Sequence, residues 1–187
     1  ITEMSEGALI VNLEQYTMPP AILRKSDGAT LYLTRDIAAA LYRKKTYKFD
    51  TMLYEVGGEQ KLHFQQLFKV LELLGYTWAK DCIHIEHGLY LGSDGKKFST
   101  RKGKTVFMTD ILDETIALAK KIIQEKNPKL KNKDAVARHV GVGAIIFGDL
   151  CNDRSRDILF DIDKFTSFEG ETGPYLQYTH ARLCSIL

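Results

Sequence analysis

The sequence predicts an α/β fold, and three observations lead to that class. Residues 52–56 form an apolar strand candidate, two glycines interrupt it, and a helical pattern follows over residues 60–74. Apolar and polar residues alternate over residues 82–86, which is typical of a second, half-buried strand. From residue 109 onward, apolar residues recur mostly at helical spacing. Strands and helices that follow one another in this way build sheets covered by helices.

Composition bounds the class of protein further. The chain has 187 residues, 44% of them hydrophobic, which is enough for a core in one domain or one and a half. A net charge of +2 does not by itself indicate a nucleic-acid binder. The three cysteines are scattered and lack metal-ligand spacing, which indicates free thiols in a reducing cytoplasm and no metal site. The sequence shows no signal peptide and no transmembrane stretch.

The N-terminal part is expected to hold extended segments and then a helix. Turn residues 26–28 lie between two strand-like runs, 22–25 and 30–33, so we expect a hairpin there. Thr34 suits the N-cap of a helix over residues 35–47.

Tyr32 and Asp36 flank this expected strand-to-helix junction. In α/β folds such a junction exposes side chains to ligand. An alternative interpretation places Tyr32 in the core and makes Asp36 a first-turn acid that complements the helix dipole.

The second half of the chain is expected to be mostly helical. A hairpin over residues 87–98, with its turn at 93–95, comes first, and residues 149–163 are expected to be irregular. Three glycines fall in one of the helical patterns, where they lower helix propensity and so predict close packing against another element. The helices are expected from residue 109, over 133–150 and over 174–187.

Residues 95–104 form a basic segment that combines five cations, two hydroxyls and two glycines without a carboxylate. A triphosphate needs this combination, because charge and hydrogen bonds can close around it. The segment lies between a strand and a helix, where open α/β sheets place their ligand crevice. The alternative is a solvated basic surface, which is the commoner role of charge runs in soluble proteins.

The basic segment also resembles a loop of a known family. Residues 97–104, Lys-Phe-Ser-Thr-Arg-Lys-Gly-Lys, are similar to the KMSKS-type loop of class I aminoacyl-tRNA synthetases in its arginyl-tRNA synthetase form. Phe98 replaces the usual methionine and Thr100 replaces the second lysine, so that Arg101, Lys102 or an upstream lysine must supply that charge. The resemblance implies a catalytic set of five residues, namely Lys97, Ser99, Thr100, Arg101 and Lys102.

Two further stretches resemble the same family, residues 31–38 at a helix entry and residues 57–68 at the end of a Rossmann strand. The resemblance implies that Tyr32, Asp36 and Gln60 hold the substrate arginine. A guanidinium has five donors in one plane, of which a carboxylate can accept two while a tyrosine and an amide oxygen engage others. The resemblance also implies ATP-binding positions, namely Gly57, Gly58, Glu59, His63, Lys97, Ser99 and Lys102.

A fourth stretch, residues 167–182, resembles the family's entry into a helical anticodon-binding domain. The four stretches together imply the C-terminal half of a class I Rossmann-type catalytic domain followed by a mostly helical linker. The implied domains are a partial catalytic domain over residues 1–106, a helical linker that contacts tRNA over 107–165, and the start of an anticodon-binding domain over 166–187.

The function implied by the resemblance is that of an arginine–tRNA ligase. Such an enzyme forms arginyl-adenylate from arginine and ATP, with Mg2+ accompanying ATP, and then transfers the arginyl group to tRNA(Arg). Arginine, ATP and tRNA(Arg) are therefore the expected partners, and the parent protein is expected to be a cytoplasmic monomer without membrane contact.

The HIGH-type motif of these enzymes does not occur in the 187 residues. The chain also begins without methionine and stops inside an apolar helical pattern. We therefore expect a fragment that does not aminoacylate tRNA alone, and a last helix whose Leu176, Leu183 and Leu187 lack cover. Two alternatives remain: a nucleotide-binding adenylyltransferase, and a non-catalytic RNA-binding module that uses residues 96–104 and the lysines between 120 and 133.

Overall fold

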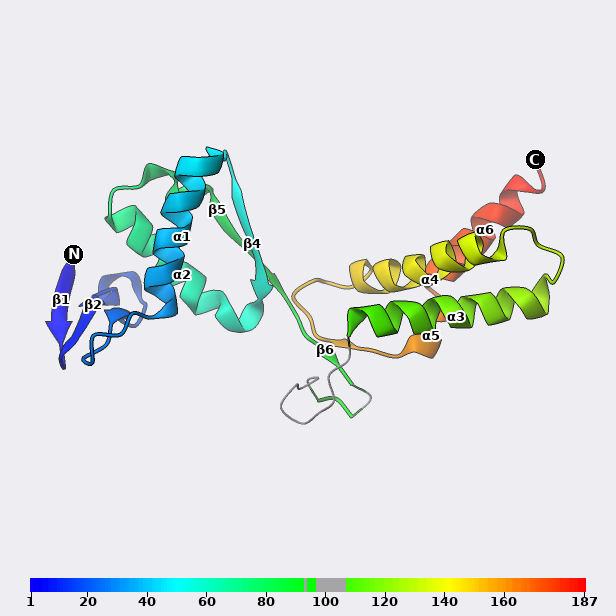
Figure 1. Ribbon diagram of the computed structural model, residues 1–187, viewed down its shortest axis with the longest axis horizontal. Helices are drawn as coiled ribbons and strands as arrows, with labels where there is room; N and C mark the ends of the chain where they lie inside the picture. Colours follow the sequence, from blue (N-terminus) through cyan, green and yellow to red (C-terminus); the bar gives the residue numbers. More distant parts are fainter. Residues whose placement is uncertain (93, 97–106) are drawn as a thin grey trace. The chain divides into compact units, whose positions relative to one another are not determined.

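The computed structural model describes residues 1–92, 94–96 and 107–187. These residues form two compact units, Ile1–His87 and Gly88–Leu187 (Figure 1). Each unit has its own arrangement of strands and helices, and each is described by itself below.

The first unit begins with an antiparallel sheet in the order β1-β2-β3. Glu6 and Gly7 both have positive φ and join the first two strands through a two-residue turn, in the register Ser5↔Ala8. The sequence analysis expected extended segments in this part of the chain but defined no strand before residue 8, so β1 is an addition to it. The sheet and the short 3-10 helix that follows β2 have these bounds: β1 Thr2–Ser5, β2 Ala8–Val11, η1 Glu14–Tyr16 and β3 Ala21–Arg24.

Helix α1 spans Tyr32–Tyr47 and corrects the expectation of a strand over residues 30–33. Only one bridge, Arg24↔Thr30, continues the expected hairpin. Leu33 is buried, and the Thr34 hydroxyl donates to the Leu23 carbonyl at 2.5 Å instead of capping the helix. Because the first helical turn packs on β3 in this way, tertiary contacts override the β propensity of this stretch.

The centre of the first unit is a parallel pair of strands, β4 (Met52–Gly57) and β5 (Cys82–His87). Their register runs from Met52↔Cys82 to Gly57↔His87. Helix α2 (Lys61–Leu73) lies between them in sequence and buries Leu67, Val70 and Leu71 in the core. The predicted strand, glycine turn and helix are confirmed. The two short 3-10 helices of this unit are η2 Gly58–Gln60 and η3 Thr77–Asp81.

Gly75 ends α2 as predicted. Its φ of +89° places it in the left-handed region, and the Tyr76 amide donates back to the Leu71 carbonyl at 3.1 Å. This is the helix-ending arrangement that favours glycine.

The second unit contains a short parallel pair, β6 (Tyr90–Leu91) with β7 (Ile158–Leu159). After β6, the Gly92 amide donates to the Lys96 carbonyl and Gly95 has a φ of +68°, which agrees with the predicted turn at 93–95, of which residue 93 lies outside the described residues. Within the part of the chain that the structure describes, however, β6 pairs with β7 and not with a second hairpin strand. The expectation of irregular structure over residues 149–163 missed this strand.

Helices make up most of the second unit, and α3 and α4 lie side by side (Figure 1). The predicted close packing of the α4 glycines is confirmed: a Cβ at Gly141 would lie 2.9 Å from the Ile116 backbone, and one at Gly148 would lie 2.2 Å from the Phe165 ring. The helix bounds are α3 Met108–Lys126, α4 Lys133–Leu150, α5 Ile162–Thr166 and α6 Gly173–Cys184.

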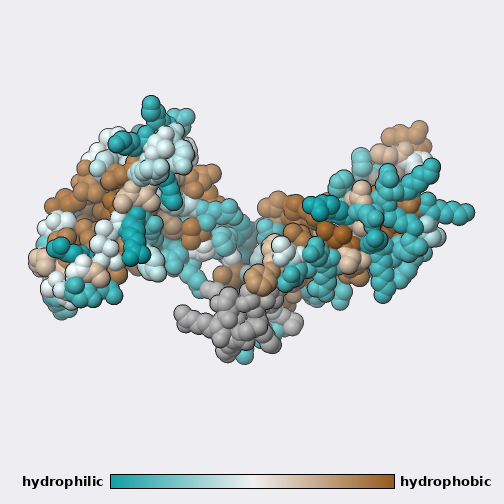
Figure 2. Space-filling model, in the orientation of Figure 1, coloured by the Kyte–Doolittle hydropathy of each residue, from teal (hydrophilic) through white to brown (hydrophobic). Residues whose placement is uncertain are grey.

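Helix α6 has Pro174 in its first turn, and Thr172 caps it by accepting from the Tyr175 amide at 3.2 Å. Leu176, Leu183 and Leu187 are all more than half exposed, as predicted for this face. Figure 2 shows hydrophobic side chains gathered at this C-terminal end. Among the described residues, no helix is both long and apolar enough to cross a bilayer.

Candidate ligand site at the start of two helices

The N-terminal parts of α1 and α2 meet through a hydrogen bond between side chains. His63 Nε2 lies 2.7 Å from Asp36 Oδ2, although the two residues are 27 positions apart. Both residues were predicted site residues, one for arginine and the other for ATP. The structure therefore brings a member of each predicted set into contact.

The other two predicted arginine-binding residues sit on the same helix starts. Tyr32 lies one turn before Asp36 on α1 and is 77% exposed, which is inconsistent with the alternative interpretation of Tyr32 as a core residue. Gln60 precedes α2 directly and stands three positions before His63. Exposed polar side chains on two adjoining helix starts can converge on one polar ligand.

Packing explains why these helix starts meet. Leu33 and Ala40 are buried on α1, and Phe64 and Leu67 are buried on α2, in one common core. The His63 ring meets the Phe64 ring edge-on, with centroids 5.3 Å apart and an interplanar angle of 82°. Apolar anchors thus surround the Asp36–His63 hydrogen bond on both helices.

The carboxyl edge of the parallel strands carries the predicted ATP-binding residues Gly57, Gly58 and Glu59. A Cβ at Gly57 or Gly58 would meet its neighbours only at ordinary contact distances of 3.7–3.9 Å, and neither glycine has positive φ. Packing within the described chain therefore does not require glycine at either position. Glycines without such a requirement leave room for close approach of a ligand to the backbone.

The sequence analysis did not identify an ion pair that lies at the same edge. Lys61 Nζ lies 3.1 Å from Glu86 Oε1, joining the start of α2 to the end of β5. The sequence did offer a signal for this pair: Lys61 lies where a predicted helix begins and Glu86 lies where a predicted strand ends, and such ends face the ligand crevice of an α/β sheet.

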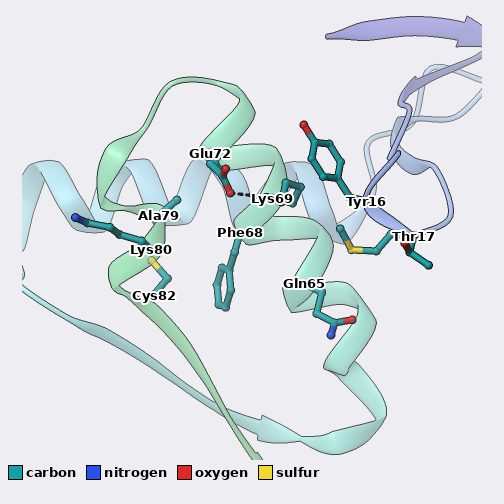
Figure 3. Close-up of a pocket in the computed structure, with 10 residues that line it drawn as sticks. Tyr16, Thr17, Gln65, Phe68, Lys69, Glu72, Ala79, Lys80 and Cys82 are labelled. Atoms are coloured by element: carbon teal, nitrogen blue, oxygen red, sulfur yellow. Dashed lines mark hydrogen bonds and ion pairs between the residues drawn. The ribbon is translucent and has the colours of Figure 1, made fainter. Parts of the chain in front are cut away.

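The cavity drawn in Figure 3 lies elsewhere in the first unit. It has a volume of about 460 Å3, and Phe68 and Cys82 line it together with a Lys69–Glu72 pair that is 2.6 Å apart. Burial raises the pKa of the Cys82 thiol, so that it stays protonated. None of the predicted site residues lines this cavity.

The five predicted catalytic residues Lys97, Ser99, Thr100, Arg101 and Lys102 lie outside the described residues. The described chain that leads to them is anchored in the second unit, where Tyr90 Oη donates to Asp149 Oδ1 at 2.6 Å. Burial and this carboxylate both raise the pKa of Tyr90. No cluster of three or more His, Cys, Asp or Glu residues suited to a metal ion occurs in the described ranges.

Known proteins are similar to this chain over most or all of its length. The family described as "tRNA synthetases class I (R), catalytic domain" matches residues 1–162. Arginine–tRNA ligase 1 of Bacillus thuringiensis is 58% identical over all 187 residues, which cover 33% of that protein. Arginine–tRNA ligase of Halothermothrix orenii is 55% identical over the same length.

Two solved structures have the same fold as the chain. Arginyl-tRNA synthetase of Thermus thermophilus matches 98% of the chain and 36% of its own length, with a TM-score of 0.84 and 27% identity. The Plasmodium falciparum enzyme gives a TM-score of 0.81 at 23% identity, over 99% of the chain and 31% of its own length. The chain spans about a third of the length of the curated relatives it matches.

Proposed function

The chain belongs to the class I arginyl-tRNA synthetase family and has the α/β catalytic-domain fold that its sequence predicts; from this premise, we propose that it provides part of an arginine–tRNA ligase. In the proposed reaction, the arginine carboxylate attacks the α-phosphate of ATP and releases pyrophosphate. A terminal ribose hydroxyl of tRNA(Arg) then takes the arginyl group from the adenylate. The observation that carries the proposal is the Asp36–His63 contact, which joins the two helix starts bearing the predicted arginine-binding residues.

We propose that Asp36 is the main acceptor for the substrate guanidinium, with Tyr32 and Gln60 beside it. Asp36 has a side chain that is 38% exposed, so a ligand can reach the carboxylate. A guanidinium can donate two parallel hydrogen bonds to a carboxylate, whereas a lysine ammonium acts as a point charge. A site of this kind favours arginine over lysine, because lysine would leave part of the site unpaired.

ATP is proposed to bind along the carboxyl edge of β4, where Gly57 and Gly58 allow close approach and Glu59 faces the ribose. The basic segment, whose residues 97–102 lie outside the described ranges, is proposed to neutralise the pyrophosphate through Lys97, Arg101 and Lys102, with Ser99 and Thr100 donating hydrogen bonds. This contribution is positioning and charge stabilisation, and no covalent nucleophile is required. Mg2+ is proposed to arrive bound to the triphosphate, because phosphate oxygens are the hard ligands that this ion prefers.

tRNA is proposed to contact the helical part of the chain. Lys126, Lys129 and Lys131 are exposed around the connector between α3 and α4 and suit contact with phosphates. The predicted domain limits at residues 106 and 165 remain predictions, and the two compact units divide earlier, between His87 and Gly88. A cytoplasmic monomer remains our expectation for the whole protein.

Calorimetric titration of the full-length protein with arginine, lysine and citrulline tests this function. We expect binding selective for arginine that Asp36→Asn weakens by at least tenfold. Asp50→Asn is the matched control, because Asp50 is an exposed aspartate of the same unit with no hydrogen-bond partner among the described residues. Equal binding of arginine and lysine would contradict the proposal. RNA binding that falls steeply with salt and ignores Asp36→Asn, without any arginine binding, would support the RNA-binding module instead.

A further inference from the structure

The contact between His63 and Asp36 imposes a defined arrangement on the predicted arginine acceptor. An ionised carboxylate has no proton to donate, so His63 Nε2 carries the hydrogen and Asp36 Oδ2 accepts it. Among the described residues, Asp36 Oδ1 has no hydrogen-bond partner. One oxygen of the carboxylate is therefore held, and the other remains available.

Packing holds the histidine more firmly than the aspartate. The His63 side chain is 21% exposed and its ring lies edge-on to Phe64, whereas the Asp36 side chain is 38% exposed. Phe64 is itself fixed, because the His84 ring stacks on it at 4.5 Å and His84 Nε2 lies 2.8 Å from the Val56 carbonyl oxygen. In binding sites, a hydrogen-bond donor that packing holds rigid often keeps the accessible, ligand-binding acceptor in one orientation.

We propose that His63 is a positioning residue for arginine recognition. Its Nε2–H holds Asp36 Oδ2, so that Oδ1 and the remaining lone pair of Oδ2 face the guanidinium in one orientation. This inference rests on the proposed function, in which Asp36 accepts the substrate guanidinium. It assigns to His63 an effect on arginine affinity that works through Asp36, in place of a direct contact with ATP.

Two substitutions separate the hydrogen bond of His63 from its packing. His63→Gln retains a donor at about the reach of Nε2 but loses the ring, and His63→Phe retains an edge-on ring against Phe64 but loses the donor. Both are measured in the full-length protein by aminoacylation of tRNA, with separate KM values for arginine and for ATP. Asp36→Asn and the double variant His63→Phe/Asp36→Asn are measured in parallel.

We expect His63→Phe to raise the KM for arginine about tenfold, which is the scale of a lost hydrogen bond to a charged group. The KM for ATP and the value of kcat should change less than twofold. His63→Gln should stay within about threefold of the wild type, and His63→Phe should add little to Asp36→Asn.

Normal arginine kinetics in His63→Phe together with a defect in His63→Gln would overturn the inference, since packing would then be the role of the histidine. A rise in the KM for ATP in both variants would also overturn it, in favour of an ATP contact. If Asp36→Asn raises the KM for arginine while His63→Phe does not, the inference fails and the proposed function stands. If Asp36→Asn leaves the KM for arginine unchanged, both fail.

Discussion

A substitution at Gly141 in α4 tests how closely α3 and α4 pack. A methyl group added there would lie 2.9 Å from both the backbone N and the Cα of Ile116, and 3.0 Å from its Cγ1. Because two of these three atoms belong to the backbone, α3 must move to make room. We therefore expect Gly141→Ala to destabilise the second unit, even though alanine is the better helix former.

The size of the destabilisation by Gly141→Ala follows from two opposing effects. Replacing glycine by alanine inside a helix stabilises it by about 1 kcal/mol. Overpacking a core typically costs about 1–3 kcal/mol, and contact with a backbone places Gly141→Ala in the upper part of that range. The expected net loss in the free energy of unfolding is about 1–2 kcal/mol.

Gly143→Ala is the matched control in the same helix. Its added methyl group would meet the Gln177 side-chain amide at 2.7 Å, and that exposed side chain can swing away. The cost is the hydrogen bond of Gln177 to the His139 carbonyl at 3.3 Å, worth about 0.5–1 kcal/mol, which nearly cancels the gain in helix propensity. The two variants should differ by about 2 kcal/mol.

Urea unfolding of the whole chain, followed by far-UV circular dichroism, measures both variants. Fluorescence of Trp78, the single tryptophan, reports on the first unit and serves as an internal reference. If Gly141→Ala proved as stable as Gly143→Ala, the close approach of α4 to the α3 backbone would be refuted.

Three further substitutions have expected outcomes. Tyr54→Phe should raise the free energy of unfolding by about 1 kcal/mol in urea titrations, because the buried Tyr54 hydroxyl has no hydrogen-bond partner among the described residues; a loss of stability would reveal a partner for that hydroxyl. Tyr90 has a pKa raised by burial and by Asp149, so the unfolded chain releases this proton first, and stability should fall as pH rises above about 10. Tyr90→Phe should flatten that pH dependence of the unfolding free energy, and an unchanged slope would contradict the cause. Thr172→Ala should cost about 1 kcal/mol in thermal unfolding by removing the acceptor for the Tyr175 amide, whereas Thr172→Ser should not.

Local patterns were sufficient to predict much of the fold. Helix α4 spans Lys133–Leu150 as predicted, since its apolar spacing, preceding polar connector and glycines all lie within the segment itself. The parallel strands around α2 were predictable for the same reason, because an apolar run followed by two glycines and a helical pattern needs no distant partner to be recognised.

Contacts distant in sequence account for what the sequence analysis missed. Residues 30–33 have strand-forming side chains, but the hydrogen bond from Thr34 to the Leu23 carbonyl and the burial of Leu33 favour a helix from Tyr32. Strand β7 has only two residues and depends on β6 for its definition, which no local pattern reveals.

The candidate site was likewise predictable in its local parts but not in its distant contact. Asp36 and His63 were identified from motifs, each in its own stretch. Their contact across 27 positions became visible only in the fold, because it depends on how α1 and α2 pack on a common core.

The pairing of β6 with β7 also sets an order of events during synthesis on the ribosome. The amide of Leu89, the residue before β6, donates to Asp157 and its carbonyl accepts from the Ile158 amide, so these partners are made only 68 and 69 residues later. At about 5–20 residues per second, a nascent chain would wait roughly 3–14 s between making β6 and making its neighbour. The strand that precedes the basic segment therefore completes its pairing only after both long helices, α3 and α4, have been translated.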